Sequence, residues 1–223
     1  MRVTPDVGLS WLAAQCDEME SLPVEELDCL VEQGAFATVL RIAARSVTDL
    51  DRPASVRLGQ DVRLLLRSSL PDETLRTVWT GATDPVFDTA KSGRTARVWL
   101  REVEAARLAA ERRADPAFVP PPAVPETDGE LRRLVLQVIR PVADDLTKAA
   151  ETSVYPLPLP GLVTALEQVV VQVCADLGYR LFLRALRTYH VPVDAGTCDR
   201  FVALGERFGH PASMVTFELN VQR

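Results

Sequence analysis

One long apolar segment constrains the fold of this chain more than any other feature. From Gly161 to about Tyr189, hydrophobic residues recur at helical spacing, but they cover more than one face of the predicted helix. A helix that is apolar around most of its girth is buried centrally or shared with another subunit. We therefore predict a core helix over 161–189, built on Leu162, Val163, Leu166, Val169, Val170, Val173, Leu177, Leu181, Phe182 and Leu186.

Helical periodicity also dominates the rest of the sequence. Apolar residues repeat at three- and four-residue steps over 21–43 and over 58–66, and 94–113 is a highly charged helix with a thin apolar stripe. The chain has 223 residues, 47% of them hydrophobic, which is enough to bury a core without disulfides or metals. The predicted fold is mainly α: a multi-helix bundle of two packed layers with a small C-terminal β element.

A proline-rich segment divides the predicted helices into two groups. The stretch 117–125 reads AFVPPPAVP, and four prolines in nine residues exclude a continuous helix or a central strand. We interpret 117–127 as an extended linker, or as a strap lying across the surface. The predicted organisation is an N-terminal helical region over 1–116, this linker or strap, and a C-terminal helical region over 128–223.

The C-terminal tail carries the clearest strand pattern. Residues 214–222, MVTFELNVQ, alternate strictly between apolar and polar side chains, which predicts a terminal strand. Its partners are either the short fragments 190–193 and 2–4, in a small internal sheet, or another chain that pairs by strand addition. The internal sheet is the preferred interpretation. In the alternative, the interaction residues are Val215, Phe217, Leu219 and Val221.

Charge and composition exclude several classes of protein. Lysine and arginine number 25 against 31 acidic residues, a net charge of -6, which disfavours non-specific nucleic-acid binding. The four cysteines form no CxxC pair, a usage typical of a reducing cytoplasm. We find no signal-peptide pattern, and the most apolar stretch, 159–175, is too short and too polar to span a bilayer. We therefore expect a cytoplasmic protein without a membrane partner.

Motifs for metal, cofactor or nucleotide chemistry are lacking. Only His190 and His210 are histidines, which excludes a three-histidine zinc site. A site combining these histidines with Cys198 matches no compact ligand spacing, although Cys198 with either histidine as its base is a conceivable nucleophile. The sequence has no phosphate-binding glycine loop of either common kind. We expect no cofactor and no metal.

One pattern at the end of the core helix suggests catalysis. Arg184 and His190 stand six residues apart in RALRTYH, and this spacing resembles the Arg-x(4-6)-His motif of the HEPN family of all-helical RNases. The resemblance implies that Arg184 and His190 act on a scissile phosphodiester, with Arg187 assisting. It covers seven residues, and Ala185 follows the arginine where the family often has a polar residue. A purely structural interpretation is a cationic helix C-terminus.

The sequence thus leaves two main functions open. The leading hypothesis is a non-catalytic interaction protein, a regulatory, immunity-type or assembly subunit, that binds another protein or itself through helical surfaces. The alternative is a small helical enzyme, most concretely a HEPN-like RNase, and only in that case is nucleic acid an expected partner. A third interpretation, a ligand-binding bundle, requires a large apolar cavity between helices.

Overall fold

The computed structural model of the chain describes residues 4–17, 22–125, 128–155 and 157–222. Within these residues the fold is mainly α with a small C-terminal β element, which confirms the predicted class. The elements before the proline-rich segment are α1 (Gly8–Gln15), α2 (Val24–Asp49), α3 (Arg52–Arg67), α4 (Asp72–Thr80), the 3-10 helices η2 (Pro85–Phe87) and η3 (Thr89–Ser92), and α5 (Ala96–Ala114). Those after it are α6 (Gly129–Thr152), α7 (Leu162–Gln172), α8 (Ala175–Thr188), β1 (Pro192–Asp194), α9 (Ala195–Arg207), α10 (Ala212–Thr216) and β2 (Asn220–Gln222).

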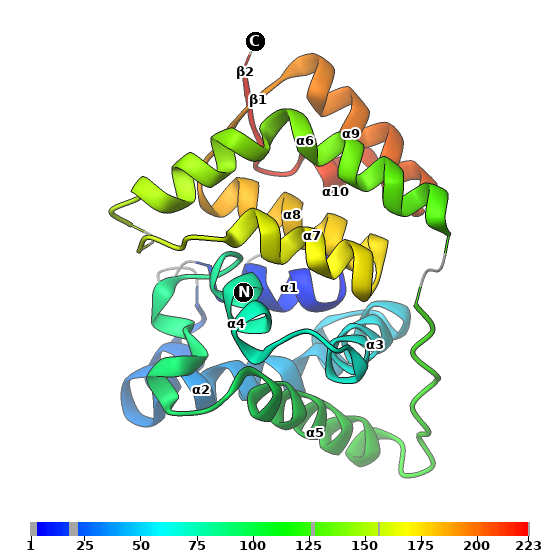
Figure 1. Ribbon diagram of the computed structural model, residues 1–223. Helices are drawn as coiled ribbons and strands as arrows, with labels where there is room; N and C mark the ends of the chain where they lie inside the picture. The colour runs from blue at the N-terminus through cyan, green and yellow to red at the C-terminus, as the bar shows by residue number, and fades with distance from the viewer. Residues whose placement is uncertain (1–3, 18–21, 126–127, 156, 223) are drawn as a thin grey trace.

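The helices form two groups that pack on each other. In the first group α2 lies along α5, and α1 lies on α3; in the second, α6, α7 and α8 all pack on one another (Figure 1). The groups meet where α1 contacts α8 and where α4 contacts α7. Helix α8 is therefore central, and all of its residues are buried.

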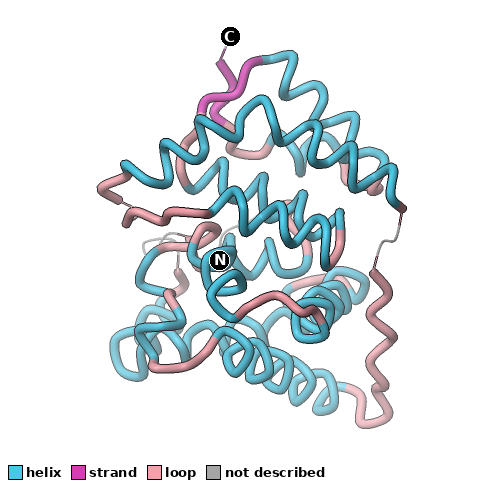
Figure 2. Tube along the Cα trace, in the orientation of Figure 1, coloured by secondary structure: helices cyan, strands magenta, loops and turns pink. Residues whose placement is uncertain are grey.

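The proline-rich segment runs as an extended loop along one side of the molecule, from the end of α5 toward the start of α6 (Figure 2). Three side chains of α3 donate hydrogen bonds to its carbonyl oxygens: Gln60 to Pro122, Arg63 to Pro121 and Arg67 to Ala123. These bonds hold residues 121–123 on the surface of α3. The division into folding units over 1–116 and 128–223 stays a prediction.

The predicted single helix over 161–189 is wrong, because the segment forms two helices, α7 and α8. The chain leaves helical geometry at Val173 (φ -120°, ψ -72°) and Cys174 (φ -163°, ψ 127°). Gly178 then lies so close to α7 that a Cβ atom there would be 2.9 Å from the backbone nitrogen of Val170. Because both helices are rich in apolar residues, they bury more surface against each other than one straight helix would.

The predicted strand over 214–222 is also wrong over its first six residues, 214–219. Residues 212–216 form α10, and only Asn220–Gln222 form a strand, which pairs in parallel with β1. Two interactions favour the helical turn: Val215 is fully buried against Gly205, and Arg187 donates hydrogen bonds to the carbonyl oxygens of Met214 and Val215. The internal pairing with the segment after His190 is confirmed, whereas residues 2 and 3 lie outside the described residues.

Candidate functional site

Three buried arginines line one face of α8. Arg180, Arg184 and Arg187 are spaced i, i+4 and i+7, which places them on one side of a helix, and we call them the arginine stripe. All three side chains are shielded from solvent. A buried guanidinium without a counter-ion is strongly destabilising, so each arginine of the stripe needs an anionic partner.

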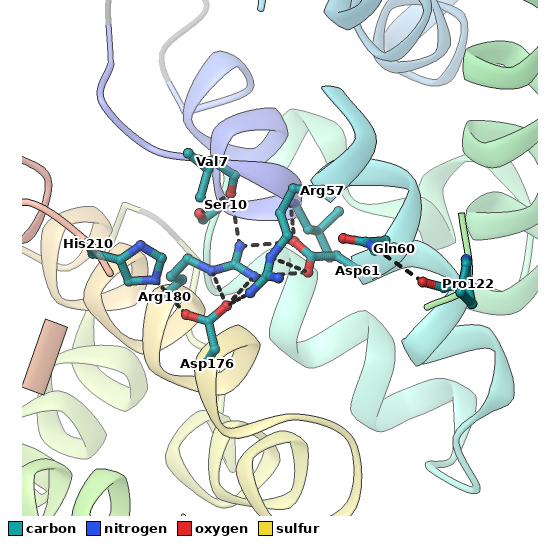
Figure 3. Close-up of polar contacts among 10 residues, drawn as sticks. Val7, Ser10, Arg57, Gln60, Asp61, Pro122, Asp176, Arg180 and His210 are labelled. Atoms are coloured by element: carbon teal, nitrogen blue, oxygen red, sulfur yellow. Dashed lines mark hydrogen bonds and ion pairs between the residues drawn. The ribbon is translucent and has the colours of Figure 1, made fainter. Parts of the chain in front are cut away.

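Arg180 pairs with Asp61 of α3 in a bidentate arrangement. Its Nη1 and Nη2 atoms each donate a hydrogen bond of 2.9 Å to the two carboxylate oxygens of Asp61 (Figure 3). Nη1 also donates to the carbonyl oxygen of Val7 at 2.9 Å, and the Leu9 amide donates to Asp61 at 2.9 Å. This pair therefore joins the start of α1, α3 and α8 in one polar cluster.

Asp176, in the first turn of α8, receives several cationic or hydrogen-bonding partners. Arg180 lies 3.0 Å away, Arg57 forms a second ion pair, and Nε2 of His210 lies 2.5 Å from the carboxylate (Figure 3). Burial alone would raise the pKa of Asp176. The charge of Arg180 and the contact with His210 outweigh burial and hold that pKa well below its usual range. Asp176 is thus an anion at neutral pH.

The other two arginines of the stripe face the N-terminal segment. Arg184 forms an ion pair with Asp17, and its Nε donates a long hydrogen bond of 3.4 Å to the carbonyl oxygen of Ala82. Arg187 donates from Nη1 to both carboxylate oxygens of Asp6, at 2.9 Å each. The stripe therefore links α8 to the N-terminal group of helices.

The catalytic candidates Arg184 and His190 lie in different environments. Arg184 is fully buried in the stripe, whereas His190 is exposed, with a left-handed φ of 50°. His190 lines a small cavity of about 180 Å³ together with Asp17, Tyr155 and Arg187, the arginine predicted to assist. The arrangement gives solvent access to the histidine and not to the arginine. The RNase assignment stays a prediction.

The four residues predicted for strand addition do not share one exposed face. Val215 is fully buried within α10, Phe217 and Leu219 are half-buried, and Val221 in β2 is 37% exposed. Their use as an interaction surface stays a prediction, but only Val221 offers an exposed apolar side chain on a strand.

A wide cavity lies elsewhere, along α2. It has a volume of about 860 Å³ and opens between the kinked middle of α2 and the 3-10 helices η2 and η3. We call it the α2 groove. Its main apolar lining residues are Leu30, Val31, Phe36, Val39, Val86 and Trp99.

A glycine in α2 shapes this groove. Gly34 has φ 86° and ψ 169°, a conformation that is essentially restricted to glycine, and it separates two helical segments. We call the first segment, 24–33, the α2 arm. The arm is held back against the second segment because buried Glu26 forms ion pairs with Arg45 at 2.5 Å and with Arg41 at 3.4 Å.

Positive charge gathers on the η3 side of the α2 groove. The guanidinium of Arg94 lies 3.8 Å from the ring centroid of Phe36, a cation–π contact, and exposed Lys91 also lines the groove. The acidic lining residue Asp88 is already committed to Arg76, through two hydrogen bonds of 2.9 Å that lower the pKa of Asp88. Arg94 also forms an exposed ion pair with Glu102 at 3.5 Å, whereas the ammonium of Lys91 forms no ion pair within the described residues.

Comparison of the chain with protein-family models, with curated proteins and with solved structures finds no match. In the part of the chain that the structure describes, no helix combines the length and apolar character needed to cross a membrane. Sequence reasoning missed this groove, although an isolated glycine within a helical pattern, here Gly34, is a recognisable signal of a local break.

Proposed function

We propose that this chain is a non-catalytic cytoplasmic interaction protein that binds a polypeptide segment in the α2 groove. The observation that supports it is the groove itself. Its volume of about 860 Å³ lies within the range typical of binding sites, roughly 300–1,000 Å³. Its lining is mostly apolar, with charged groups on one side, and this combination suits an amphipathic occupant.

A polypeptide fits the surroundings of the groove better than a small molecule does. The apolar side chains Val24, Leu27 and Val31 follow one another at i, i+3 and i+7 along the α2 arm, and Val31 reaches the groove. Val24 is 69% exposed and Val31 is 85% exposed. Seven residues of helix span about 10 Å, so this apolar line extends well beyond the cavity. A helix lying in a groove covers a line of this kind through its own i, i+3 and i+7 anchors.

Charge defines the occupant further. Lys91 brings an unpaired positive charge to the η3 side, and Arg94 brings a second one that is shared with exposed Glu102, while Asp88 is neutralised by Arg76. Arg94 stacks on Phe36 and forms an exposed ion pair with Glu102 at 3.5 Å. Because a guanidinium carries five N–H donors, Arg94 can still donate to a further carboxylate. The favoured occupant is an amphipathic segment with acidic residues beside its apolar face.

Peptide selection tests this function. Random peptides of helical length, displayed on phage, are selected on the immobilised chain, and each selected peptide is then measured against two variants. Val31→Glu places a charge at the groove, and Val119→Glu places the same charge at an equally exposed valine of the proline-rich segment, 80% exposed. We expect binding to be lost with Val31→Glu and kept with Val119→Glu. If no selected peptide depends on Val31, the proposed function is wrong.

The RNase alternative makes an opposite prediction. If the chain cleaves RNA, His190→Ala abolishes the cleavage, and the exposed position of His190 makes this substitution structurally mild. Under the proposed function, the purified chain leaves RNA intact, and the wild-type and His190→Ala proteins behave alike in that assay. Cleavage by the wild-type protein that His190→Ala removes would favour the enzyme.

A further inference from the structure

The α2 arm has the chemistry that the α2 groove requires of its occupant. Its apolar line of Val24, Leu27 and Val31 has a parallel acidic line beside it: Glu25, Asp28 and Glu32. Both lines have the spacing i, i+3 and i+7. Each acidic residue directly follows one of the apolar residues, and one residue of an α-helix turns by about 100°, so the two lines lie about 100° apart around the helix. The three acidic side chains are all exposed. The arm is thus an amphipathic segment with carboxylates along one edge of its apolar face.

Within one copy, the arm cannot fill the groove, because it already forms one wall of it. Leu30, Val31 and Gln33 of the arm line the cavity, and buried Glu26 anchors the arm to Arg45 on the second segment of α2. Val24 and Val31 of the arm therefore remain uncovered beside a groove that matches them, while Leu27 is partly buried against the core. A second copy brings a second arm and a second groove.

We propose that the α2 groove of one copy receives the α2 arm of a second copy, so that the chain forms a two-fold symmetric dimer. This inference rests on the proposed function and names the partner. In such an isologous contact the same surface serves both subunits. The two arms run antiparallel about the symmetry axis, and Val31 of each enters the groove of the other. The acidic line of each arm then faces Lys91 and Arg94 of the other copy.

The charges close to the contact matter more for dimer formation than the net charge of each copy does. Each copy carries a net charge of -6, so two copies repel each other at long range. At physiological ionic strength this repulsion is screened beyond about 8 Å, whereas carboxylates that contact Lys91 and Arg94 directly are screened much less. Among the described residues that line the groove, the one other charged side chain is Asp88, which is paired with Arg76. Arg94 is paired with exposed Glu102 at 3.5 Å, so the unpaired positive charge at the groove is that of Lys91.

Sedimentation equilibrium tests the surface. The wild-type chain is expected to associate as a dimer with rising concentration. Val31→Glu is expected to raise the dissociation constant by at least about tenfold, the change that 1.4 kcal/mol produces. The matched variant Val119→Glu should leave it unchanged. Because Val31 is 85% exposed, its replacement does not disturb the core, and circular dichroism verifies that the variant is folded.

A charge exchange tests the pairing between Lys91 and the acidic line. Lys91→Glu and Glu32→Lys each place like charges opposite one another at both contacts of a homodimer, so each variant alone should be a weaker dimer. In a one-to-one mixture, both contacts of the mixed dimer join opposite charges. The mixture should therefore associate more tightly than either variant. Equal association of the mixture and the separate variants would refute the proposed pairing.

The outcomes separate this inference from the proposed function. If the chain stays monomeric but binds selected peptides, and this binding depends on Val31, the proposed function holds. The proposal that the partner is a second copy is then wrong. A dimer that is insensitive to both Val31→Glu and Lys91→Glu also overturns the inference, because another surface must then hold it. If the groove holds a small carboxylate-bearing amphiphile instead, the chain is monomeric and no selected peptide depends on Val31.

Discussion

Arg180 and Asp61 face each other through two hydrogen bonds of 2.9 Å, although 119 residues separate them in sequence. Both side chains are buried, one on α8 and the other on α3. A buried ion pair contributes little net stability over an apolar pair, but any other placement of the helices would leave a charge without its partner. The pair therefore specifies how the N-terminal helices sit on the central helix.

Breaking this pair should strongly destabilise the fold. Asp61→Asn leaves Arg180 with a neutral amide on one side and Asp176 as its remaining carboxylate partner. We expect the free energy of unfolding to fall by about 3 kcal/mol in urea titrations, the lower end of the range for a broken buried pair. The matched control is Glu130→Gln, which breaks the exposed pair between Glu130 and Arg207. That pair should contribute less than about 1 kcal/mol. Equal effects of the two substitutions would contradict the structural role assigned to Asp61.

The backbone beside Asp61 has no room for a side chain. Gly8 has a φ of 62°, and a Cβ atom there would lie 2.1 Å from Oδ2 of Asp61. Gly8→Ala is therefore expected to lower the midpoint of urea unfolding, because it combines a steric clash with a left-handed backbone, a strain of about 1–3 kcal/mol before the clash is counted. Gly129→Ala, where a Cβ meets nothing within 4 Å, is the control and should be close to neutral.

Acid should weaken the cluster around Asp176. The pKa of this carboxyl is held below its unfolded value of about 3.9, so the folded state binds fewer protons than the unfolded state does. The stability that Asp176 contributes is complete above about pH 5 and is lost as the pH falls through about 4 and below. Asp176→Asn should therefore be less stable than wild type near neutral pH, with a difference that shrinks on acidification.

Urea titrations from about pH 7 down to about pH 3 check this expectation. The comparison variant is Asp144→Asn, at an exposed position of α6 that has no role in the cluster. Its difference from wild type should stay small over the whole range. A difference for Asp176→Asn that stays constant with pH would show that the carboxylate is not stabilised by its charged partners.

The kink in α2 should be required for self-association. Gly34→Ala introduces no clash, since a Cβ there meets nothing within 4 Å, but it forces a residue with a side chain into a conformation restricted to glycine. We expect the arm to change direction and the dimer to dissociate, while helicity measured by circular dichroism is retained. Gly161→Ala, also at an open glycine with positive φ but before α7, should leave association unchanged. If the Gly34→Ala variant still forms the dimer, the kink in α2 is not required for the contact between the two copies.

Local pattern determined the class of this fold and several of its elements. Apolar spacing predicted the helices, the four prolines of 117–125 predicted an extended segment, and alternation near the C-terminus predicted a strand that exists in Asn220–Gln222. These features depend on residues that are close together in the sequence, and periodicity and proline geometry reflect such local relationships. The spacing of Arg180, Arg184 and Arg187 is likewise visible in the sequence. The sequence does not show which aspartates form ion pairs with these arginines.

Tertiary structure decided what periodicity could not. The apolar stretch of 161–189 divides at Val173 because two helices packed on each other bury more surface than one. Residues 212–216 become helical because Arg187 satisfies their carbonyl oxygens from a distant part of the chain. The α2 groove exists only because Gly34, η3 and α5 come together in space. Each of these outcomes depends on contacts between residues far apart in sequence, whose energies no local pattern contains.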